Sequence, residues 1–233
     1  MKILALDTST KVASVAIIDQ DKMLAEYFVN TDKMNHSQKL MPVIDGVIKD
    51  LGIDLREIDY YAVSVGPGSF TGLRIGVATV KGMAYANNKK VVAVDTLDAI
   101  ANNVSYSDDI VCCIMDARNR QVYVAMYDGK KKIVEDTAID IDELIDKLIF
   151  LGTRIIFVGD GVLVYSEYLK EKLQDNFVMP RRVDVLPRAS SVAELALGKI
   201  QNQEILSCED LVPNYLRKSQ AEREYEKNHK KGD

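Results

Sequence analysis

The most distinctive string in the sequence is the glycine-rich stretch at residues 66–76, GPGSFTGLRIG. It stands where an apolar, strand-like run gives way to a helix-like run. Gly66 and Gly68 permit positive φ and close backbone approach, and the free N–H groups of a helix start can receive a phosphate or a carboxylate. In the structural alternative the two glycines only form a tight turn, and Ser69 or Thr71 caps the helix. The sequence leaves both interpretations open.

The helix expected after this turn, residues 69–86, is nearly free of charge. Only Arg74 and Lys81 carry charge beyond its first turn. Gly72 and Gly76 lie four apart on one face, where small residues let another backbone approach closely. A helix that is apolar on most sides must be covered on most sides, by its own domain or by another chain. The pattern slightly favours a partner surface over burial inside the monomer.

The composition limits the chemistry available to the chain. The 233 residues carry a net charge of -5, which disfavours strong binding of nucleic acid by the isolated chain. Cys112 and Cys113 are adjacent, so on a strand they point to opposite faces rather than toward one metal. His36 and His229 are the only histidines, too few for a histidine-rich metal site. No apolar run approaches a membrane span, and we expect a cytoplasmic protein with no membrane contact.

The hydrophobic pattern predicts the same order of elements twice: three strands, a helix, a strand, a helix, a strand and a helix. In the first pass the strands are expected at 2–7, 13–19, 23–30, 60–65 and 91–95, and the helices at 36–51, 69–86 and 97–103. In the second the strands are expected at 110–116, 121–127, 132–136, 154–158 and 183–186, and the helices at 142–151, 162–173 and 191–203.

This duplication predicts an α/β fold of two ribonuclease-H-like halves that face each other across a cleft, as in actin, Hsp70 and sugar kinases. The first half, residues 1–104, carries the glycine string and the helices that we expect to dock with a partner protein. The second half covers residues 105–217, and residues 218–233 form a charged tail. Asp140 and Glu143 predict a capping box at the helix start near residue 142.

Two aspartates end the first strand of each half. Actin-like kinases need a glycine just after this aspartate, because the hairpin backbone must approach the ATP phosphates closely. Asp7 is followed by Thr8 and Ser9, and Asp116 is followed by alanine and Arg118, so neither hairpin offers that glycine. An internal turn role is favoured for both aspartates. The candidates for nucleotide or anion binding remain Asp7, Thr8, Ser9, Gly66, Gly68, Ser69 and Arg118.

Several strings together resemble the TsaB (YeaZ) family over nearly the whole chain. They are ILALDTS at residues 3–9, HSQ at 36–38, the glycine string at 66–76, DAR at 116–118 and VPNYLR at 212–217. The resemblance implies an inactive paralogue of TsaD. In TsaD-like proteins a His-x-x-x-His pair on the first helix holds a metal, whereas here His36 is followed four residues later by Leu40.

The resemblance also implies a function and its partners. Such a protein is a non-catalytic scaffold that pairs with TsaD when a threonylcarbamoyl group is added to the adenosine beside the anticodon of tRNA. TsaE completes the set, ATP and a metal belong to the partner proteins, and tRNA is bound only within the complex. A homodimer uses an overlapping surface. The residues expected at the partner interface are His36, Leu40, Ile44, Val47, Thr71, Gly72, Leu73, Gly76, Val80, Met83 and Ala84.

Three enzymatic readings compete with the scaffold. An actin-like ATP-dependent phosphotransferase is supported by the fold and by the string GDG at 159–161, and is weakened by the two hairpins without glycine. A glycoprotease-like metallopeptidase lacks histidine ligands. A serine hydrolase based on Ser69 is least favoured, because the string does not make Gly-x-Ser-x-Gly. The scaffold hypothesis predicts that Gly76→Glu or Ala84→Glu abolishes the heterodimer with TsaD and leaves the fold intact.

Overall fold

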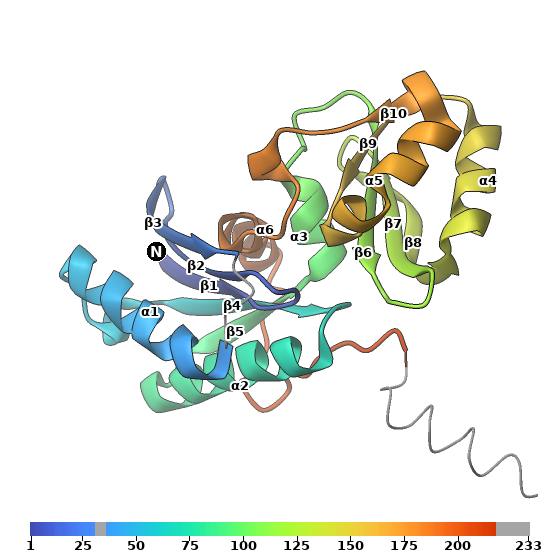
Figure 1. Ribbon diagram of the computed structural model, residues 1–233. Coiled ribbons are helices and arrows are strands. Elements are labelled where there is room, and N and C mark those ends of the chain that lie inside the picture. Colours follow the sequence, from blue (N-terminus) through green and yellow to red (C-terminus); the bar gives the residue numbers. More distant parts are fainter. Residues whose placement is uncertain (31–35, 218–233) are drawn as a thin grey trace, which may run out of the picture.

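The computed structural model describes residues 1–30 and 36–217, and the predicted tail lies outside the described residues. It contains two five-stranded sheets, each with helices on both faces, which form the two lobes seen in Figure 1. The predicted α/β fold with a repeated order of elements is confirmed. No helix in the described ranges is long and apolar enough to cross a bilayer.

The first sheet has the strand order β3-β2-β1-β4-β5. The strands β1 (Lys2–Asp7), β2 (Ala13–Asp19) and β3 (Lys22–Val29) form an antiparallel meander. The strands β4 (Tyr60–Gly66) and β5 (Lys90–Asp95) continue the sheet in parallel beside β1. The carboxyl ends of β1 and β4 therefore lie together, which brings the turn after Asp7 beside the glycine string.

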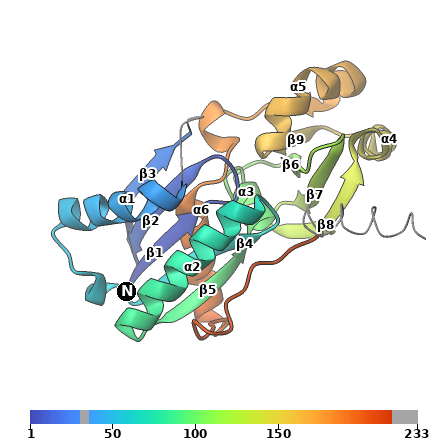
Figure 2. The ribbon, with the colours of Figure 1, turned by 60° about the horizontal axis from the view of Figure 1, so that its bottom comes forward.

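Three helices cover the first sheet. The helices α1 (His36–Leu51) and α2 (Phe70–Asn87) lie side by side on one face, as Figures 1 and 2 both show. The opposite face is covered by α6 (Ala189–Gln201). Successive residues of a strand point to opposite faces, so β1 supplies Leu4 to the core under α1 and α2 and Ala5 to the core under α6.

The second sheet has the order β10-β9-β6-β7-β8. Its strands are β6 (Ile110–Asp116), β7 (Gln121–Asp128), β8 (Lys131–Asp140), β9 (Ile155–Val158) and β10 (Phe177–Val178). The helices α4 (Ile141–Leu151) and α5 (Asp160–Leu173) cover one face, and α3 (Thr96–Asn102) covers the other. Cys112 and Cys113 are both buried, each in the core of a different face, as their adjacency predicts.

The two halves exchange a helix. Although α3 follows β5 in the chain, its residues Leu97 and Ile100 are buried in the core of the second sheet. The reverse holds for α6, which follows the second sheet in the chain but buries Val192 and Ala193 against the first. Beyond α6 the chain runs along the first lobe, where Leu206 pairs with Val91 in an isolated bridge, before it reaches the second lobe at Leu216 and Arg217. A domain boundary at residue 104 remains a prediction. Each of the two cores contains residues from before and from after this position.

Two local expectations are wrong. The last strand of the second half lies at residues 177–178, whereas the predicted strand at 183–186 begins as a 3-10 turn, Arg182–Asp184. Val185 and Leu186 are buried, which explains the apolar signal without a strand. At the start of α4, Asp140 caps the N–H of Asp142 at 2.9 Å, but Glu143 pairs with Lys147 instead of completing a capping box.

The helix exchange predicts that neither half folds by itself. A chain of residues 1–104 lacks α6, so the sheet face of Ile3 and Val92 would meet water. We expect no cooperative unfolding of this fragment in a urea titration followed by circular dichroism. A control chain of residues 1–217 should unfold in one transition, and a sigmoidal transition of the short fragment would contradict the interlocked cores.

Candidate functional site

The glycine string lies against the turn that follows β1. The Ser69 amide donates to the carbonyl oxygen of Ser9 at 2.7 Å, and Thr8 Oγ1 donates to the carbonyl oxygen of Gly72 at 2.8 Å. A Cβ at Gly72 would overlap the carbonyl oxygen of Thr8, and one at Gly76 would overlap Thr8 Oγ1. The glycine face of α2 is therefore filled by the backbone and side chain of this turn.

The other side of the string is filled by the C-terminal segment, residues 206–217, which runs along α2 toward the second lobe (Figure 2). Asn214 donates its amide to the carbonyl oxygen of Val65 at 2.7 Å, and a Cβ at Gly66 would overlap the carbonyl oxygen of Asn214. Phe70 stacks on Tyr215 with 4.4 Å between the ring centroids. The glycines thus serve close internal contacts.

The helix start itself is capped from within the chain. Ser69 Oγ accepts a hydrogen bond from the Gly72 amide at 3.3 Å, and Ser69 adopts the extended backbone of an N-cap. Of the two interpretations of the string, this geometry favours the structural one, because the glycines leave no face free for a phosphate.

The carboxylate of Asp7 is fully buried beneath this turn. Its Oδ1 accepts from the amide of Ser9 at 2.9 Å and from Ser9 Oγ at 2.8 Å, while Ser64 Oγ donates to Oδ2. Burial raises the pKa of Asp7, and these hydrogen bonds oppose the rise. The side chain is committed to holding the turn, which agrees with the internal role expected from the sequence.

The second half repeats this arrangement. Gly159 has φ 101°, and a Cβ there would overlap the carbonyl oxygen of Ile114. Asp160 Oδ1 accepts from the amide of Asp116 at 3.2 Å, and burial raises the pKa of Asp160 to about 6. This loop is also closed, here by the backbone of the neighbouring strand β6. Arg118 lies apart from it, on an exposed turn.

The structure gives His36 a local partner. Its Nε2 lies 2.9 Å from the carbonyl oxygen of Thr10, while its Nδ1 is buried without a partner among the described residues. A ring nitrogen beside a carbonyl oxygen carries the proton, so Nε2 is the donor. Leu40, at the position of a second histidine ligand, is buried in the first core.

Three carboxylates converge elsewhere, where α3 meets the second sheet. Asp95, Asp98 and Asp136 bring oxygen atoms within 4.8 Å of one another. The Lys132 ammonium already lies among them, 2.7 Å from Asp98 and 2.6 Å from Asp136, and Tyr127 donates its hydroxyl to Asp98 at 2.7 Å. The lysine fills the place of a cation, so we interpret the cluster as an ionic lock between α3 and the sheet.

Most residues expected at a partner interface are buried in the monomer. Leu73, Val80 and Ala84 have no exposed surface, and Met83 is 6% exposed. The buried members are Leu40, Ile44, Gly72, Leu73, Gly76, Val80, Met83 and Ala84, while His36 and Val47 are half-buried and Thr71 is exposed. Gly76→Glu and Ala84→Glu are therefore poor probes of docking, because both would place a charge in the chain's own core.

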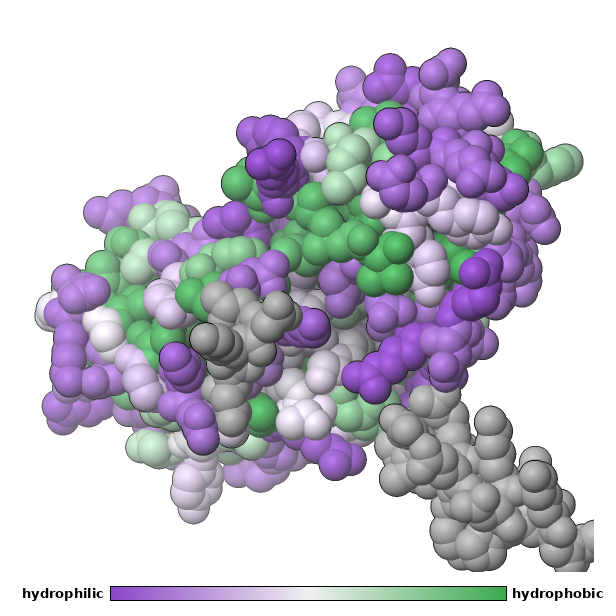
Figure 3. All heavy atoms as spheres, viewed as in Figure 1, coloured by the Kyte–Doolittle hydropathy of each residue, from purple (hydrophilic) through white to green (hydrophobic). Residues whose placement is uncertain are grey.

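The outward face of α2 carries a different set of residues, none of which is among those expected at the partner interface from the sequence. Ala78, Gly82 and Tyr85 are exposed, and a Cβ at Gly82 would meet nothing within 4 Å. On α1 the exposed side includes Met41, 47% exposed. In Figure 3 the surface over α1, at the left, mixes apolar and hydrophilic residues. The spacing of 78, 82 and 85 is itself helical, and only the position of the sheet decides which stripe is buried.

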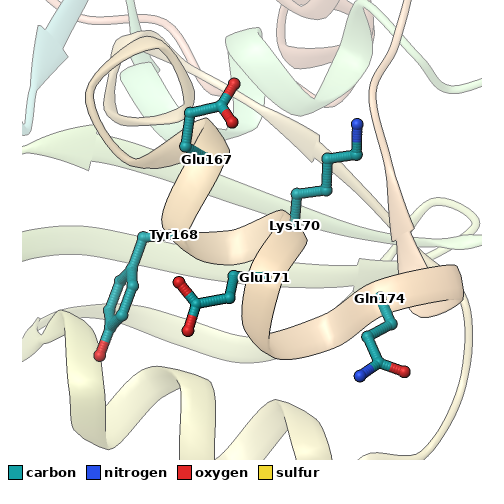
Figure 4. A pocket seen from close by; sticks show the side chains of 5 residues that line it. All are labelled: Glu167, Tyr168, Lys170, Glu171 and Gln174. Atoms are coloured by element: carbon teal, nitrogen blue, oxygen red, sulfur yellow. The ribbon is translucent and has the colours of Figure 1, made fainter.

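A surface hollow of about 680 Å³ lies over α5, far from the glycine string. Its lining residues are Glu167, Tyr168, Lys170, Glu171 and Gln174. In Figure 4 the side chains of Glu167 and Lys170 point upward and the other three point to the opposite side, so the five do not converge on one point. Tyr168 donates its hydroxyl to Asp142 at 2.6 Å, so it ties α5 to α4. The hollow offers no converging set of reactive groups.

Comparison with known proteins places these features in a family. Residues 24–225 match the family model described as TsaD, tRNA N6-adenosine threonylcarbamoyltransferase. The TsaB protein of Bacillus subtilis, a tRNA threonylcarbamoyladenosine biosynthesis protein, is 30% identical over 95% of this chain and 96% of its own length. The chain belongs to the TsaD family, in its TsaB branch.

Other TsaB relatives agree in sequence and in fold. The TsaB protein of Escherichia coli is 28% identical over 95% of this chain and 96% of its own length. A Pseudomonas aeruginosa structure described as similar to the peptidase YEAZ superposes with a TM-score of 0.76 at 26% identity, covering 93% of this chain and 99% of that one. The family resemblance inferred from the sequence is thereby confirmed.

The closed contact between α2 and the β1 turn predicts a contrast between two glycines of one helix. Gly76→Ala forces a Cβ onto Thr8 Oγ1 and should lower the free energy of unfolding by roughly 1–3 kcal/mol. Gly82→Ala meets open space and should raise it by roughly 0.4–1 kcal/mol. Urea unfolding measures both, and equal effects would contradict the packing.

The ionic lock predicts a pH dependence of stability. Burial, with Asp136 and Asp98 nearby, raises the pKa of Asp95 to about 8, against an ordinary value of 3.8. Between about pH 4 and 8 the unfolded chain has lost a proton that the folded chain keeps, so the free energy of unfolding falls as pH rises. Asp95→Asn removes this loss and still caps the amide of Leu97.

The stability gained by Asp95→Asn should therefore grow from pH 5 to pH 8 and then stay level. Thermal midpoints of both proteins across this range measure it. Parallel profiles would show that Asp95 is already ionised in the folded chain at pH 5.

Proposed function

We propose that this chain is a non-catalytic scaffold for the biosynthesis of threonylcarbamoyladenosine in tRNA, acting as the partner of TsaD. The closure of both glycine loops by the chain's own backbone carries this proposal. A phosphotransferase of this fold needs those loops open to ATP phosphates, and here Thr8, Gly72 and Gly76 are packed together. The names of the TsaB relatives indicate the pathway that we propose, the biosynthesis of threonylcarbamoyladenosine in tRNA.

The docking surface that we propose is the outward side of α1 and α2. It combines Met41 on α1 with Ala78, Gly82 and Tyr85 on α2. Small residues at 78 and 82 allow a partner helix to approach closely, and Tyr85, 76% exposed, offers a large amphipathic anchor. The two helices are neighbours, so together they form a continuous face for another helix pair.

The remaining partners of the proposal are those that the family resemblance implies. A homodimer that uses this face competes with the TsaD heterodimer, because one surface cannot serve two partners at once. TsaE joins the heterodimer rather than the isolated chain, and tRNA binds only to the assembled complex. ATP and a metal belong to the partner proteins in this arrangement.

The substitution Gly82→Glu tests the proposed docking surface, and it should leave the fold of the chain intact because Gly82 is exposed. The substitution places a charge at the centre of the proposed interface and should weaken association with TsaD more than tenfold. Gly198→Glu on α6 is the matched control, because it is also an exposed helical glycine with open space around it. Size-exclusion chromatography with light scattering gives the complex mass. Undiminished association of the Gly82 variant would refute the surface.

A further inference from the structure

The turn between β6 and β7 has an unusual backbone. Arg118, Asn119 and Arg120 have φ values of 63°, 53° and 60°, all in the left-handed region that residues with a Cβ seldom occupy. Gln121 closes the turn, since its amide donates to the carbonyl oxygen of Arg118 at 3.1 Å. Three such residues in succession must be held in place by the surrounding structure.

The two arginines of this turn have different environments. The Arg120 guanidinium donates to both carboxylate oxygens of Asp142 at 2.7 Å, which fixes one side of the turn to α4. The Arg118 side chain is exposed and makes no hydrogen bond or ion pair with any described residue. Glycine would fit the φ of Arg118 with less strain, so folding does not account for an arginine at this position.

Two further arginines lie along the C-terminal segment that reaches this turn. Arg217 donates to the carbonyl oxygen of Ala117 at 3.1 Å, which places it beside the turn. Arg74 donates to the hydroxyl of Tyr215 at 2.9 Å, next to the stacked pair of Tyr215 and Phe70. In Figure 1 this segment leaves α2 and ends close to the lower edge of the second lobe.

Most of the described arginines that form no ion pair belong to this group of three. Five of the described arginines form ion pairs with carboxylates: Arg56, Arg120, Arg154, Arg181 and Arg188. Within the described ranges, Arg74, Arg118 and Arg217 form none, and the fourth without an ion pair, Arg182, lies apart in the 3-10 turn of the second lobe. These three guanidinium groups are thus left without an ion-pair partner among the described residues, although the carboxylate of Asp116 accepts the backbone amide of Arg118 at 2.9 Å.

We propose that Arg118, Arg217 and Arg74 form a contact for the sugar–phosphate backbone of tRNA within the assembled complex. This inference rests on the proposed function, which brings tRNA to the complex. Guanidinium groups bind phosphate oxygens in a fixed fork geometry, and arginines beside stacked aromatic rings are typical of nucleic-acid surfaces.

The test measures tRNA affinity of the complex formed with TsaD and TsaE, using an unmodified tRNA transcript that the wild-type complex modifies. Arg118→Gly removes the guanidinium and relieves the backbone, so the thermal midpoint should stay or rise. The affinity should fall three- to tenfold, and the slope of log affinity against log salt should decrease by about one. Arg118→Gly combined with Arg217→Gln should decrease that slope by about two.

Arg154→Gly on the far side of the second lobe is the control, since its guanidinium pairs with Asp109 at 3.5 Å, and it should leave the salt slope unchanged. Unchanged affinity and slope in the Arg118 variant would overturn the contact. Loss of complex mass in that variant would also overturn it, because the arginine would then face an acidic protein surface. If the wild-type chain does not assemble with TsaD, the proposed function fails and this contact fails with it.

Discussion

The close contact between the β1 turn and the glycine face of α2 is the constraint on which the rest of the molecule depends. Thr8 bonds to the carbonyl oxygen of Gly72, and its hydroxyl oxygen occupies the space that any side chain at Gly76 would need. Asp7, buried below, holds the turn through Ser9 and Ser64. If the β1 turn and the glycine string lay apart, their backbone amides could bind a phosphate. In this chain the two segments are packed directly against each other.

The same contact between the β1 turn and α2 determines which face of α2 points to solvent. Because α2 is fixed at its start by Ser69 and along its inner face by small residues, its opposite face must point to solvent. That face carries Ala78, Gly82 and Tyr85, and Arg74 is the charged residue among the exposed positions of α2. The closed loops and the small, mostly uncharged residues on the outward face of α2 support our proposal that the chain binds another protein.

Much of the fold could be predicted because short apolar runs mark the strands and apolar residues recur at helical spacing along the helices. The exchange of α3 and α6 could not, since the apolar stripe of a helix does not say which sheet it covers. The same limit explains the interface: Val80 and Ala84 were expected to face a partner, yet the sheet covers them and leaves Ala78 and Gly82 outside. The ion pair of Asp98 with Lys132 joins residues far apart in sequence, with no local signal.

The most direct measurement of the central claim is a calorimetric titration of the isolated chain with Mg-ATP. We predict no saturable heat up to millimolar nucleotide, because the glycine loops of both halves are filled by the chain's own backbone. Saturable binding at micromolar nucleotide, weakened by Asp7→Asn, would contradict this prediction and would show that the contact between the β1 turn and α2 opens to a ligand.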